Sequence, residues 1–338
     1  MNITTLGIDI AKNIFQVHGV DRWGKKVINK AITRNKLPEF INNLPPCLIG
    51  MEACSGSNYW GQKFTEMGHE VKLISPQFVK PYVKSNKNDA LDAEAICEAV
   101  DRPNMRFVAI KNKEQQDIQC IHKVRARLVR ERTARANQIR GLLHEYGIVI
   151  PLGINRVKDD VPKILREEGN GLTSCGRELF LDLYTELRNI DFKVREYDKK
   201  IALICESNPM CKLLCKLPGI GALTATAITA LIGNITVFKN GRELAAYLGL
   251  VPKQASSGGK SRLLGISKRG DRYVRCLLIH GARAVLFCAK NLPAKKTNWL
   301  NELTTRRGFN RAVVALANKN ARVIWALMTK GEEFVWNI

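Results

Sequence analysis

The sequence has few histidines and no paired metal-binding cysteines. Its five histidines form no HxxxH motif, and none of its ten cysteines belongs to a CxxC pair or lies beside a histidine at zinc-like spacing. These absences exclude the common zinc motifs and argue against histidine-based catalysis. Cys211 and Cys215, four residues apart, are expected to share a helix face and to pack as small apolar side chains.

Long apolar runs and recognisable targeting segments are also missing. No run approaches the roughly 18 apolar residues that a membrane span needs. The first residues, MNITTLGIDIAK, show no basic stretch followed by an apolar one and a cleavage site. GxxxxGK[ST], the nucleotide-binding P-loop motif, is absent as well. Aromatic residues make up only 7% of the chain, so no stacking platform for bases is evident. We therefore expect an intracellular protein without a membrane partner.

Positive charge is abundant. The 338 residues contain 54 Lys and Arg against 31 Asp and Glu, which gives a net charge of +23 and a pI near 9.8. Hydrophobic residues reach 45%, an ordinary value for a folded chain. A folded protein with this excess of charge is typical of those that bind polyanions. The length predicts two or three domains.

Residues 1–110 alternate between strand and helix patterns. Strands are predicted within 3–12, where ITTLGIDIAK runs into a turn, and near 15–20, 25–32, 47–52 and 70–75, with a hairpin turn at 21–24 and helices near 35–44 and 57–67. This alternation predicts a mixed sheet with helices on its faces, an α/β domain.

The pattern becomes helical from about residue 111. Residues 113–146 contain no proline and only one glycine, Gly141, and predict a long helix with a narrow apolar seam among basic side chains. A second long helix is predicted at 177–207, after an irregular linker with a short helix at 151–176. The two could pair as an antiparallel coiled coil. The basic face is either simply solvated or contacts nucleic acid or a second copy; its arginines are Arg125, Arg127, Arg130 and Arg132.

A third region begins near residue 209, and we divide the chain into 1–110, 111–208 and 209–338. LPGIG at 217–221, followed by a small-residue helix, resembles a helix-hairpin-helix turn. Its Gly219 and Gly221 would let backbone N–H groups approach a phosphate, although such turns also join ordinary helices. The region is expected to be mostly helical to Lys330.

Four acidic residues fall at strand ends or at a helix start in the first domain. Asp9 and Glu52 end predicted strands, and Asp89 and Asp92 begin the helix NDALDAEAI. Strand ends at one sheet edge share a cleft, and four carboxylates there suit two Mg²⁺ ions that clamp a phosphodiester. The alternative is structural: Asp89 as a helix N-cap and Asp92 as a partner of the helix dipole.

A basic loop with two serines forms the other candidate site. Ser256 and Ser257 precede two glycines in SSGGK. A serine there could attack a phosphodiester, with the cations stabilising the developing charge; on chemistry alone, a loop that only grips phosphate is favoured. The basic residues of this segment are Lys253, Lys260, Arg262, Lys268, Arg269, Arg272, Arg275 and Arg283.

Together the motifs GIDIAK, MEACSGS, NDALDAEAI, LPGIG and PKQASSGGKSRLLGISKRGDRYVRCLL resemble, in this order, the DEDD-type insertion-sequence transposases. The resemblance covers nearly the whole chain. It implies a RuvC-like (RNase H-like) first domain and a C-terminal transposase domain in a bacterial or archaeal cytoplasmic, nucleoid-associated protein.

The same resemblance implies roles for individual residues and partners. Asp9, Glu52, Asp89 and Asp92 would hold Mg²⁺, with Mn²⁺ as an alternative, and Ser257, or else Ser256, would be the nucleophile. The partners would be double-stranded DNA of the element ends and target, a noncoding guide RNA, and further copies of the chain, as a coiled-coil dimer or a tetramer on DNA. Two alternatives remain: a hydrolytic nuclease for branched DNA, and a nucleic-acid-binding protein without catalysis.

Overall fold

The computed structural model describes residues 2–83, 88–288 and 294–331. It divides into two compact units, one formed by the residues up to Gln115 together with Ile232–Lys239, the other by Gln116–Leu231 and the residues from Asn240 onward. The first division falls close to the predicted boundary at 110. The predicted boundary at 208/209 lies inside the second unit and stays a prediction. Within the described ranges, every helix is too short or too polar to serve as a membrane span.

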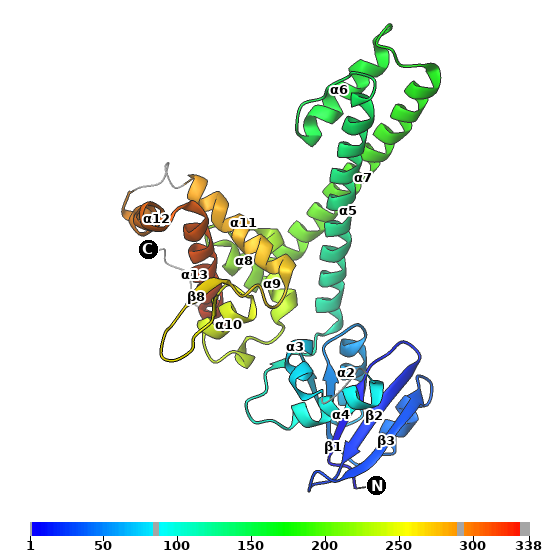
Figure 1. The fold of residues 1–338 in the computed structure, drawn as a ribbon, viewed down its shortest axis with the longest axis vertical. Helices are drawn as coiled ribbons and strands as arrows, with labels where there is room; N and C mark the ends of the chain where they lie inside the picture. Colours follow the sequence, from blue (N-terminus) through cyan, green and yellow to red (C-terminus); the bar gives the residue numbers. More distant parts are fainter. Residues whose placement is uncertain (1, 84–87, 289–293, 332–338) are drawn as a thin grey trace. The chain divides into compact units, whose positions relative to one another are not determined.

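A six-stranded mixed sheet forms the centre of the first unit (Figure 1). Its order is β3-β2-β1-β4-β5-β6. The strands are β1 (Thr5–Asp9), β2 (Ile14–Val20), β3 (Lys26–Thr33), β4 (Leu48–Glu52), β5 (Glu70–Ile74) and β6 (Phe107–Val108). β1, β4 and β5 run parallel, whereas the β1–β2, β2–β3 and β5–β6 pairs are antiparallel. The predicted hairpin and the mixed α/β sheet are confirmed.

Helices cover this sheet and bury its core. They are α1 (Leu37–Asn42), α2 (Ser57–Glu66), α3 (Pro76–Val79) with the 3₁₀ turn η1 (Lys80–Tyr82), and α4 (Asp89–Val100). The core gathers the alternate inward side chains of the strands, such as Leu6, Ile8 and Ile49, with Trp60 and Phe64 of α2. The residues that enter this core alternate along β1 and β4, because successive side chains of a strand point to opposite faces of the sheet, and α4 covers the other face.

Two glycines allow α4 to lie directly against the sheet. A Cβ on Gly7 of β1 would come within 2.3 Å of the Ala93 carbonyl oxygen, and one on Gly50 of β4 within 2.8 Å of Val100. At the other end of β1, the Thr5 hydroxyl donates to Asp101, 3.2 Å away. α4 therefore runs antiparallel to β1, and its first turn lies at the end of the strand that carries Asp9.

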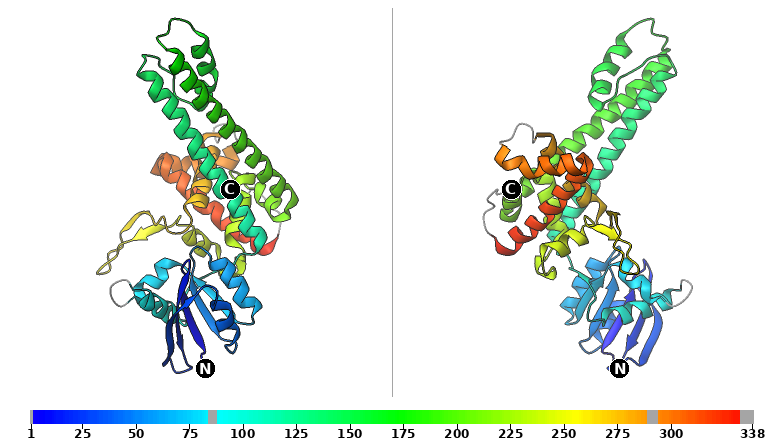
Figure 2. Two further views of the ribbon diagram at one scale, coloured as in Figure 1. Left: turned by 90° about the vertical axis from the view of Figure 1, so that its right-hand side faces the viewer. Right: turned by 60° about the vertical axis from the view of Figure 1, so that its left-hand side comes forward.

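The second unit contains two long antiparallel helices, α5 (Lys113–His144) and α7 (Ser174–Ser207) (Figures 1 and 2). The ion pairs Arg125–Asp198 and Arg132–Asp191, 2.5 and 2.8 Å long, join them at successive levels, and Arg135 pairs with Glu186. Apolar residues of both helices and of α6 (Ile154–Arg166) share one core, which includes Ile139, Leu143 and Leu187. Both long helices were predicted, and the ion pairs show that they run antiparallel; that they form a coiled coil stays a prediction.

The short helix predicted inside the linker at 151–176 is present as α6. α6 has 13 residues and continues through Pro162, which normally ends a helix because it offers no N–H to the carbonyl four residues earlier. That carbonyl belongs to Lys158, and the Tyr184 hydroxyl of α7 donates to it at 3.2 Å. A long-range hydrogen bond thus replaces the missing local one, which the local sequence pattern does not reveal.

The remaining helices form a bundle. They are α8 (Pro209–Cys215), α9 (Ala222–Ile232), α10 (Gly241–Tyr247), α11 (Arg272–Cys288), α12 (Ala294–Arg307) and α13 (Phe309–Lys330); the 3₁₀ turn η2 (Ile235–Val237) belongs to the first unit. α13 contacts α10, α11 and α12. The strands β7 (Pro252–Gln254) and β8 (Leu263–Ile266) form an antiparallel hairpin. Cys211 is buried, as predicted, and Cys215 is partly buried with its Sγ 3.5 Å from that of Cys205.

One buried histidine contributes to this packing. The imidazole of His122 on α5 lies 3.1 Å from the Tyr273 hydroxyl and 3.0 Å from the Thr226 hydroxyl, so it links three helices. Burial, with a smaller contribution from Arg125, lowers the pKa of His122 to about 4. It is therefore neutral at pH 7, and its position inside the bundle gives it a structural role.

The LPGIG turn packs against α11 through a close backbone approach. Gly219 has a φ of 82°, and a Cβ on Gly281 of α11 would lie 1.8 Å from the Gly219 carbonyl oxygen. Only glycine fits at position 281 without moving one of the two elements.

Gly281→Ala is accordingly expected to lower the free energy of unfolding of the second unit by about 1–3 kcal/mol, the usual cost of overpacking. Gly141→Ala is the matched control, because no atom lies within 4 Å of a Cβ there. Gly141 lies in the last turn of α5, where alanine should stabilise the helix by up to about 0.5–1 kcal/mol. Urea unfolding followed by circular dichroism measures both; equal stability of the two variants would contradict the close approach.

Candidate active site

Three carboxylates meet at the end of β1. One carboxylate oxygen from each of Asp9, Asp89 and Asp92 lies within 4.8 Å of the other two. Asp9 ends β1, and the two others belong to the first turn of α4, where the helix dipole favours negative charge. The sequence predicted this meeting from strand-end and helix-start positions.

Glu52 stands at the end of the neighbouring strand. β1 and β4 pair in parallel with Ile8 opposite Met51, so the next residues, Asp9 and Glu52, leave the sheet at the same edge. Burial raises the pKa of Glu52, and the negative charges of Asp9 and Asp92 raise it further. The four predicted residues therefore share one negative field, although only three of them form the tight cluster.

The structural alternative for Asp89 is wrong, because the helix N-cap is the preceding residue. The side chain of Asn88 accepts a hydrogen bond from the Ala90 N–H at 3.0 Å, and Asp89 is the first residue of α4. Since Asn88 already caps the helix, the Asp89 carboxylate is not needed for that purpose. Its exposed position beside Asp9 fits a ligand for a cation.

The chemistry of the donor set fits a hard divalent cation. All the clustered donors are carboxylate oxygens, the ligands that Mg²⁺ and Mn²⁺ accept. The nearby Cys54 does not change this character. Burial raises the pKa of its thiol, as do Glu52 and Asp9, so the thiol stays protonated and is a poor metal ligand. A bound cation would neutralise the repulsion that these carboxylates otherwise exert on one another.

The serine loop is the tip of the β7–β8 hairpin. Gly258 and Gly259 both have positive φ, 55° and 76°, and the Lys260 N–H donates to the Ser257 carbonyl at 3.0 Å. This geometry is a type I′ turn, which requires positive φ at both central residues. Ser257 thus directly precedes the turn, and residues 252–265 of the hairpin are exposed.

The two serines differ in their hydrogen bonds. The Ser256 hydroxyl accepts from Gln254 Nε2 at 2.9 Å. Among the residues that the structure describes, no hydrogen bond engages the Ser257 hydroxyl. Ser257 is therefore the more available of the two for reaction.

The base of the hairpin is tightly fixed. A Cβ on Gly249 would lie 2.2 Å from the Arg269 carbonyl oxygen, and one on Gly270 would lie 1.9 Å from that of Tyr247. The Lys268 N–H donates to the Gly249 carbonyl at 3.1 Å, and Lys268 is the one non-glycine residue with positive φ in the described ranges. The exposed tip is consequently carried on a base held by close backbone contacts.

Arg275 is a correction to the predicted nucleic-acid-binding set. It is only 7% exposed, and its Nη1 donates to the carbonyls of Leu248, Arg269 and Gly270. Its guanidinium therefore fixes the hairpin base and does not face solvent. The sequence could not distinguish it from its exposed neighbours, which are Lys253, Lys260, Arg262, Lys268, Arg269, Arg272 and Arg283.

The arginines of α5 divide in the same way. Arg125 and Arg132 pair with aspartates of α7, and their side chains are 17% and 24% exposed. Asp191, although its burial opposes ionisation, has a lowered pKa because Lys158 and Arg132 donate hydrogen bonds to it. Arg125 and Arg132 thus hold the two helices together, so the prediction that they bind nucleic acid is wrong. Arg127 and Arg130 remain exposed.

The two glycines of LPGIG also differ. Gly219 packs against Gly281, whereas a Cβ on Gly221 would meet nothing within 4 Å and Gly221 is exposed. Gly221 lies just before α9 (Ala222–Ile232), so of the two it is the one open to an approaching phosphate. The role of Gly219 is to allow close packing.

A mixed sheet in the order β3-β2-β1-β4-β5-β6, with carboxylates at the end of β1 and in the first turn of α4, fits the RuvC-like class of polynucleotide-processing domains. Comparison with known families agrees: residues 6–148 match the DEDD transposase family of the IS110 type, described as "Transposase", and residues 211–298 match the family "Transposase IS116/IS110/IS902 family". The chain belongs to this IS110-type transposase family and is an enzyme that acts on DNA.

Curated relatives resemble the whole chain. A transposase for insertion sequence element IS1111A from Coxiella burnetii is 49% identical over 98% of this chain and 92% of its own length. A probable family 20 transposase from Pseudomonas aeruginosa is 46% identical over 98% of both chains. A transposase for insertion sequence element IS1328 from Yersinia enterocolitica is 38% identical over 98% of this chain and 99% of its own. Family membership argues against the alternative of a binding protein without catalysis.

Proposed function

We propose that this transposase cuts and joins DNA at the ends of its element through a serine nucleophile. The clustered carboxylates Asp9, Asp89 and Asp92 carry this proposal, with Glu52 beside them. Divalent cations, Mg²⁺ or alternatively Mn²⁺, would be held by these residues and would supply charge neutralisation at the scissile phosphate.

In this proposal Ser257 performs the transfer. Its Oγ forms an ester bond to phosphorus, and the bond from phosphorus to one deoxyribose oxygen breaks. That oxygen leaves as a hydroxyl and takes up the proton that the serine has lost. Because the phosphoserine ester conserves the bond energy, the DNA can be rejoined without hydrolysis. The exposed cations of the hairpin, such as Lys260 and Arg262, would stabilise the charge on phosphorus.

The proposed partners are double-stranded DNA of the element ends and target, and a noncoding guide RNA. The exposed Arg127, Arg130, Lys268, Arg269 and Arg272 would contact phosphates, and Gly221 would admit a phosphate at the start of α9. Binding through phosphates predicts a strong dependence on salt. A composite site, with the carboxylates of one copy facing the serine hairpin of another, is part of the same proposal.

The proposal is tested with DNA that spans the element's end junction, Mg²⁺ and the adjacent noncoding RNA. Products are separated on a denaturing gel before and after protease treatment. We expect a retarded DNA band that protease removes. Mg²⁺-dependent cleavage that yields only free nicked ends would contradict the serine mechanism.

A hydrolytic nuclease is the second candidate function. It is favoured by one observation: the three clustered carboxylates all belong to the first unit, so this cluster needs no residue from the serine hairpin. Water would then be the nucleophile, as in nucleases that act on branched DNA, and the same gel separates the two possibilities.

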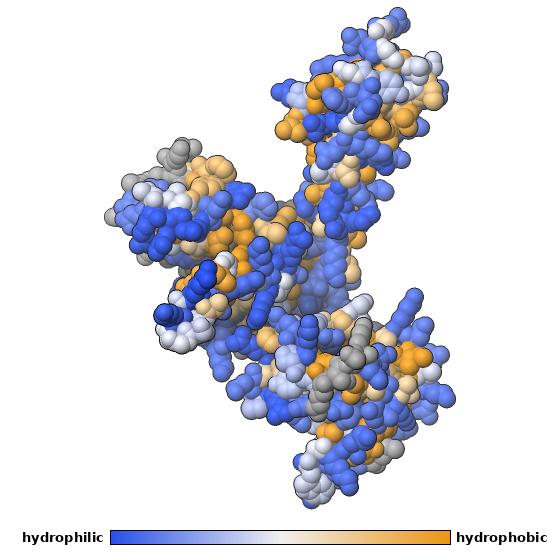
Figure 3. All heavy atoms as spheres, in the orientation of Figure 1, coloured by the Kyte–Doolittle hydropathy of each residue, from blue (hydrophilic) through white to orange (hydrophobic). Residues whose placement is uncertain are grey.

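Assembly is proposed to use the outer face of α7. Leu181, Phe192 and Leu203 are 52%, 65% and 64% exposed and follow one another at intervals of eleven residues, which places them on one helix face. Apolar side chains also gather where α6 joins the long helices (Figure 3). Apolar residues that recur every eleven positions on one helix face suit contact with a second helix, and on this basis we propose a dimer, or a tetramer on DNA.

Phe192→Asp is expected to convert this dimer to monomer at micromolar concentration, because a charge would be buried between the copies. Lys193→Asp, a neighbouring exposed position, should leave the mass unchanged. Light scattering during gel filtration measures both. A wild-type chain that is monomeric, or a Phe192→Asp variant that stays dimeric, would contradict the use of this face.

A further inference from the structure

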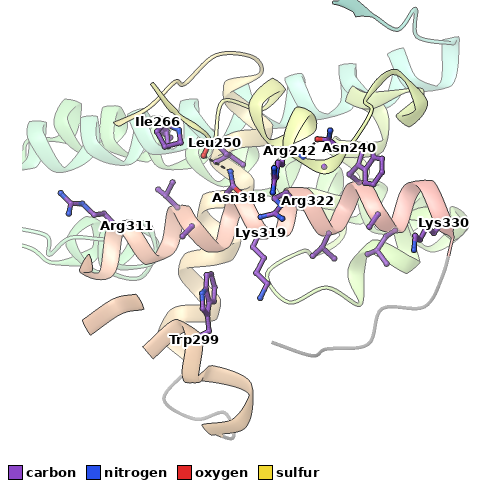
Figure 4. Close-up of a pocket in the computed structure, with 18 residues that line it drawn as sticks. Asn240, Arg242, Leu250, Ile266, Trp299, Arg311, Asn318, Lys319, Arg322 and Lys330 are labelled. Atoms are coloured by element: carbon purple, nitrogen blue, oxygen red, sulfur yellow. Dashed lines mark hydrogen bonds between the residues drawn. The ribbon is translucent and has the colours of Figure 1, made fainter. Parts of the chain in front are cut away.

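A wide basic groove lies in the second unit, apart from the serine hairpin tip (Figure 4). Its cavity has a volume of about 1240 Å³ and lies along α13, with α10, α12 and the hairpin base contributing the other walls. Its lining contains five cations and no acidic residue; the cations are Arg242, Arg311, Lys319, Arg322 and Lys330. None of these was singled out from the sequence.

The cations are held together against their mutual repulsion. Arg322 and Lys319 lie close enough that Arg322, after burial, contributes to a lowered pKa of the Lys319 ammonium. Gly241 allows α10 to approach α13, since a Cβ there would lie 2.9 Å from the Arg322 backbone. Arg242 follows in the first turn of α10, where the helix dipole disfavours positive charge. A cavity whose lining gathers several positive side chains and no carboxylate is typical of a site that binds anions.

An indole adds a second kind of surface to the groove. Trp299 of α12 lines the cavity, and the Lys319 ammonium lies 4.6 Å from the centre of its ring. Trp325 of α13 lines the same cavity. Aromatic rings beside cations bind polynucleotides whose bases are unpaired, because a base stacks on the ring while its phosphate meets the cation. The bases of a duplex are already stacked on one another and offer no free face.

The groove is also elongated. The lining residues of α13 run from Arg311 to Lys330, which is about 28 Å at 1.5 Å per residue. That length accommodates several nucleotides of a single strand; for comparison, one OB fold binds about 4–16 nucleotides.

We propose that this groove binds an unpaired stretch of polynucleotide, with its phosphates on Arg242, Lys319 and Arg322 and a base against Trp299. The inference rests on the proposed function for the class of ligand, a polynucleotide. It assigns to this groove a function distinct from cleavage, which is to bind a polynucleotide strand that is not base-paired.

The test measures binding of fluorescent 15-nucleotide strands by anisotropy. Oligo-dT, oligo-U and a 15-base-pair duplex are compared in EDTA with the full chain carrying Ser257→Ala, so that no cleavage intervenes. Trp299→Ala should weaken binding of a single strand about fivefold or more, whereas duplex binding should change less than twofold. Trp299→Phe should restore most of the affinity. The DNA and RNA arms identify which strand the groove prefers.

The charge component is tested by salt. Arg322→Gln should weaken single-strand binding and make the slope of log K against log[salt] shallower by about 0.7, the value for one lost phosphate contact on a single strand. Lys26→Gln, which removes the same charge from the exposed strand β3 of the first unit, is the matched control and should leave the slope unchanged. Melting temperatures of all variants confirm folding.

Three results would overturn the inference: no measurable single-strand binding, an equal loss for duplex and single strand in Trp299→Ala, or displacement by a polyglutamate peptide of equal charge at equal concentration. The last would indicate a site for acidic peptides. Failure of the proposed function is seen separately, as wild-type protein that forms no adduct in the cleavage assay.

Discussion

Replacing Asp92 with asparagine is expected to reduce Mg²⁺-dependent DNA cleavage by about 10³-fold or more. The substitution keeps the shape of the side chain but removes the charge of one of the three clustered carboxylates. Metal ions supply several kcal/mol of charge stabilisation in phosphoryl transfer, and each 1.36 kcal/mol is worth a factor of ten in rate. DNA binding, which depends on the exposed cations, should change little.

Asp101→Asn is the matched control, since it makes the same substitution at the opposite end of α4. Its side chain accepts the hydrogen bond from Thr5, which asparagine can still accept. Cleavage by Asp101→Asn should remain near the wild-type rate.

Metal binding can also be measured without catalysis, from the melting temperature. Mg²⁺ should raise the melting temperature of the wild type more than that of Asp92→Asn. Equal cleavage by Asp92→Asn and wild type would rule out a role for the cluster.

The carboxylate cluster could be predicted because strand ends and helix starts have local sequence signals. Alternating apolar residues located β1, the short apolar run CLIGME located β4, and NDALDAEAI located the start of α4. The residues that let α4 pack closely against the sheet could not be predicted from the sequence. Gly7 and Gly50 bring α4 against the sheet, yet a glycine within a strand has no local sign that a helix will cross it.

The interface for nucleic acid was harder to predict because charge alone does not reveal exposure. Arg272 and Arg275 are three residues apart in one basic segment, but Arg272 is exposed and Arg275 is buried on three backbone carbonyls. Arg132 likewise pairs with Asp191, 59 residues away. The basic groove was missed for the converse reason: its cations come from α10 and α13, and Trp299 joins them only when α12 packs on α13.

Replacing Ser257 with alanine is expected to eliminate the protease-sensitive DNA–protein band entirely. The phosphoserine ester cannot form without the hydroxyl oxygen, so the loss should be complete within detection and should not depend on Mg²⁺ concentration. The change is mild for the fold, because Ser257 is exposed and the type I′ turn that follows it depends on Gly258 and Gly259.

Two further serines of the same hairpin serve as controls. Ser256→Ala removes a hydroxyl that Gln254 already engages, and Ser261→Ala removes an exposed one on the other side of the turn; both should still form the adduct. An adduct lost in Ser256→Ala and kept in Ser257→Ala would exchange the two roles. Nicked DNA with free ends, produced equally by wild type and Ser257→Ala but abolished in Asp92→Asn, would mean that water attacks at the carboxylate site and that the hairpin only holds DNA.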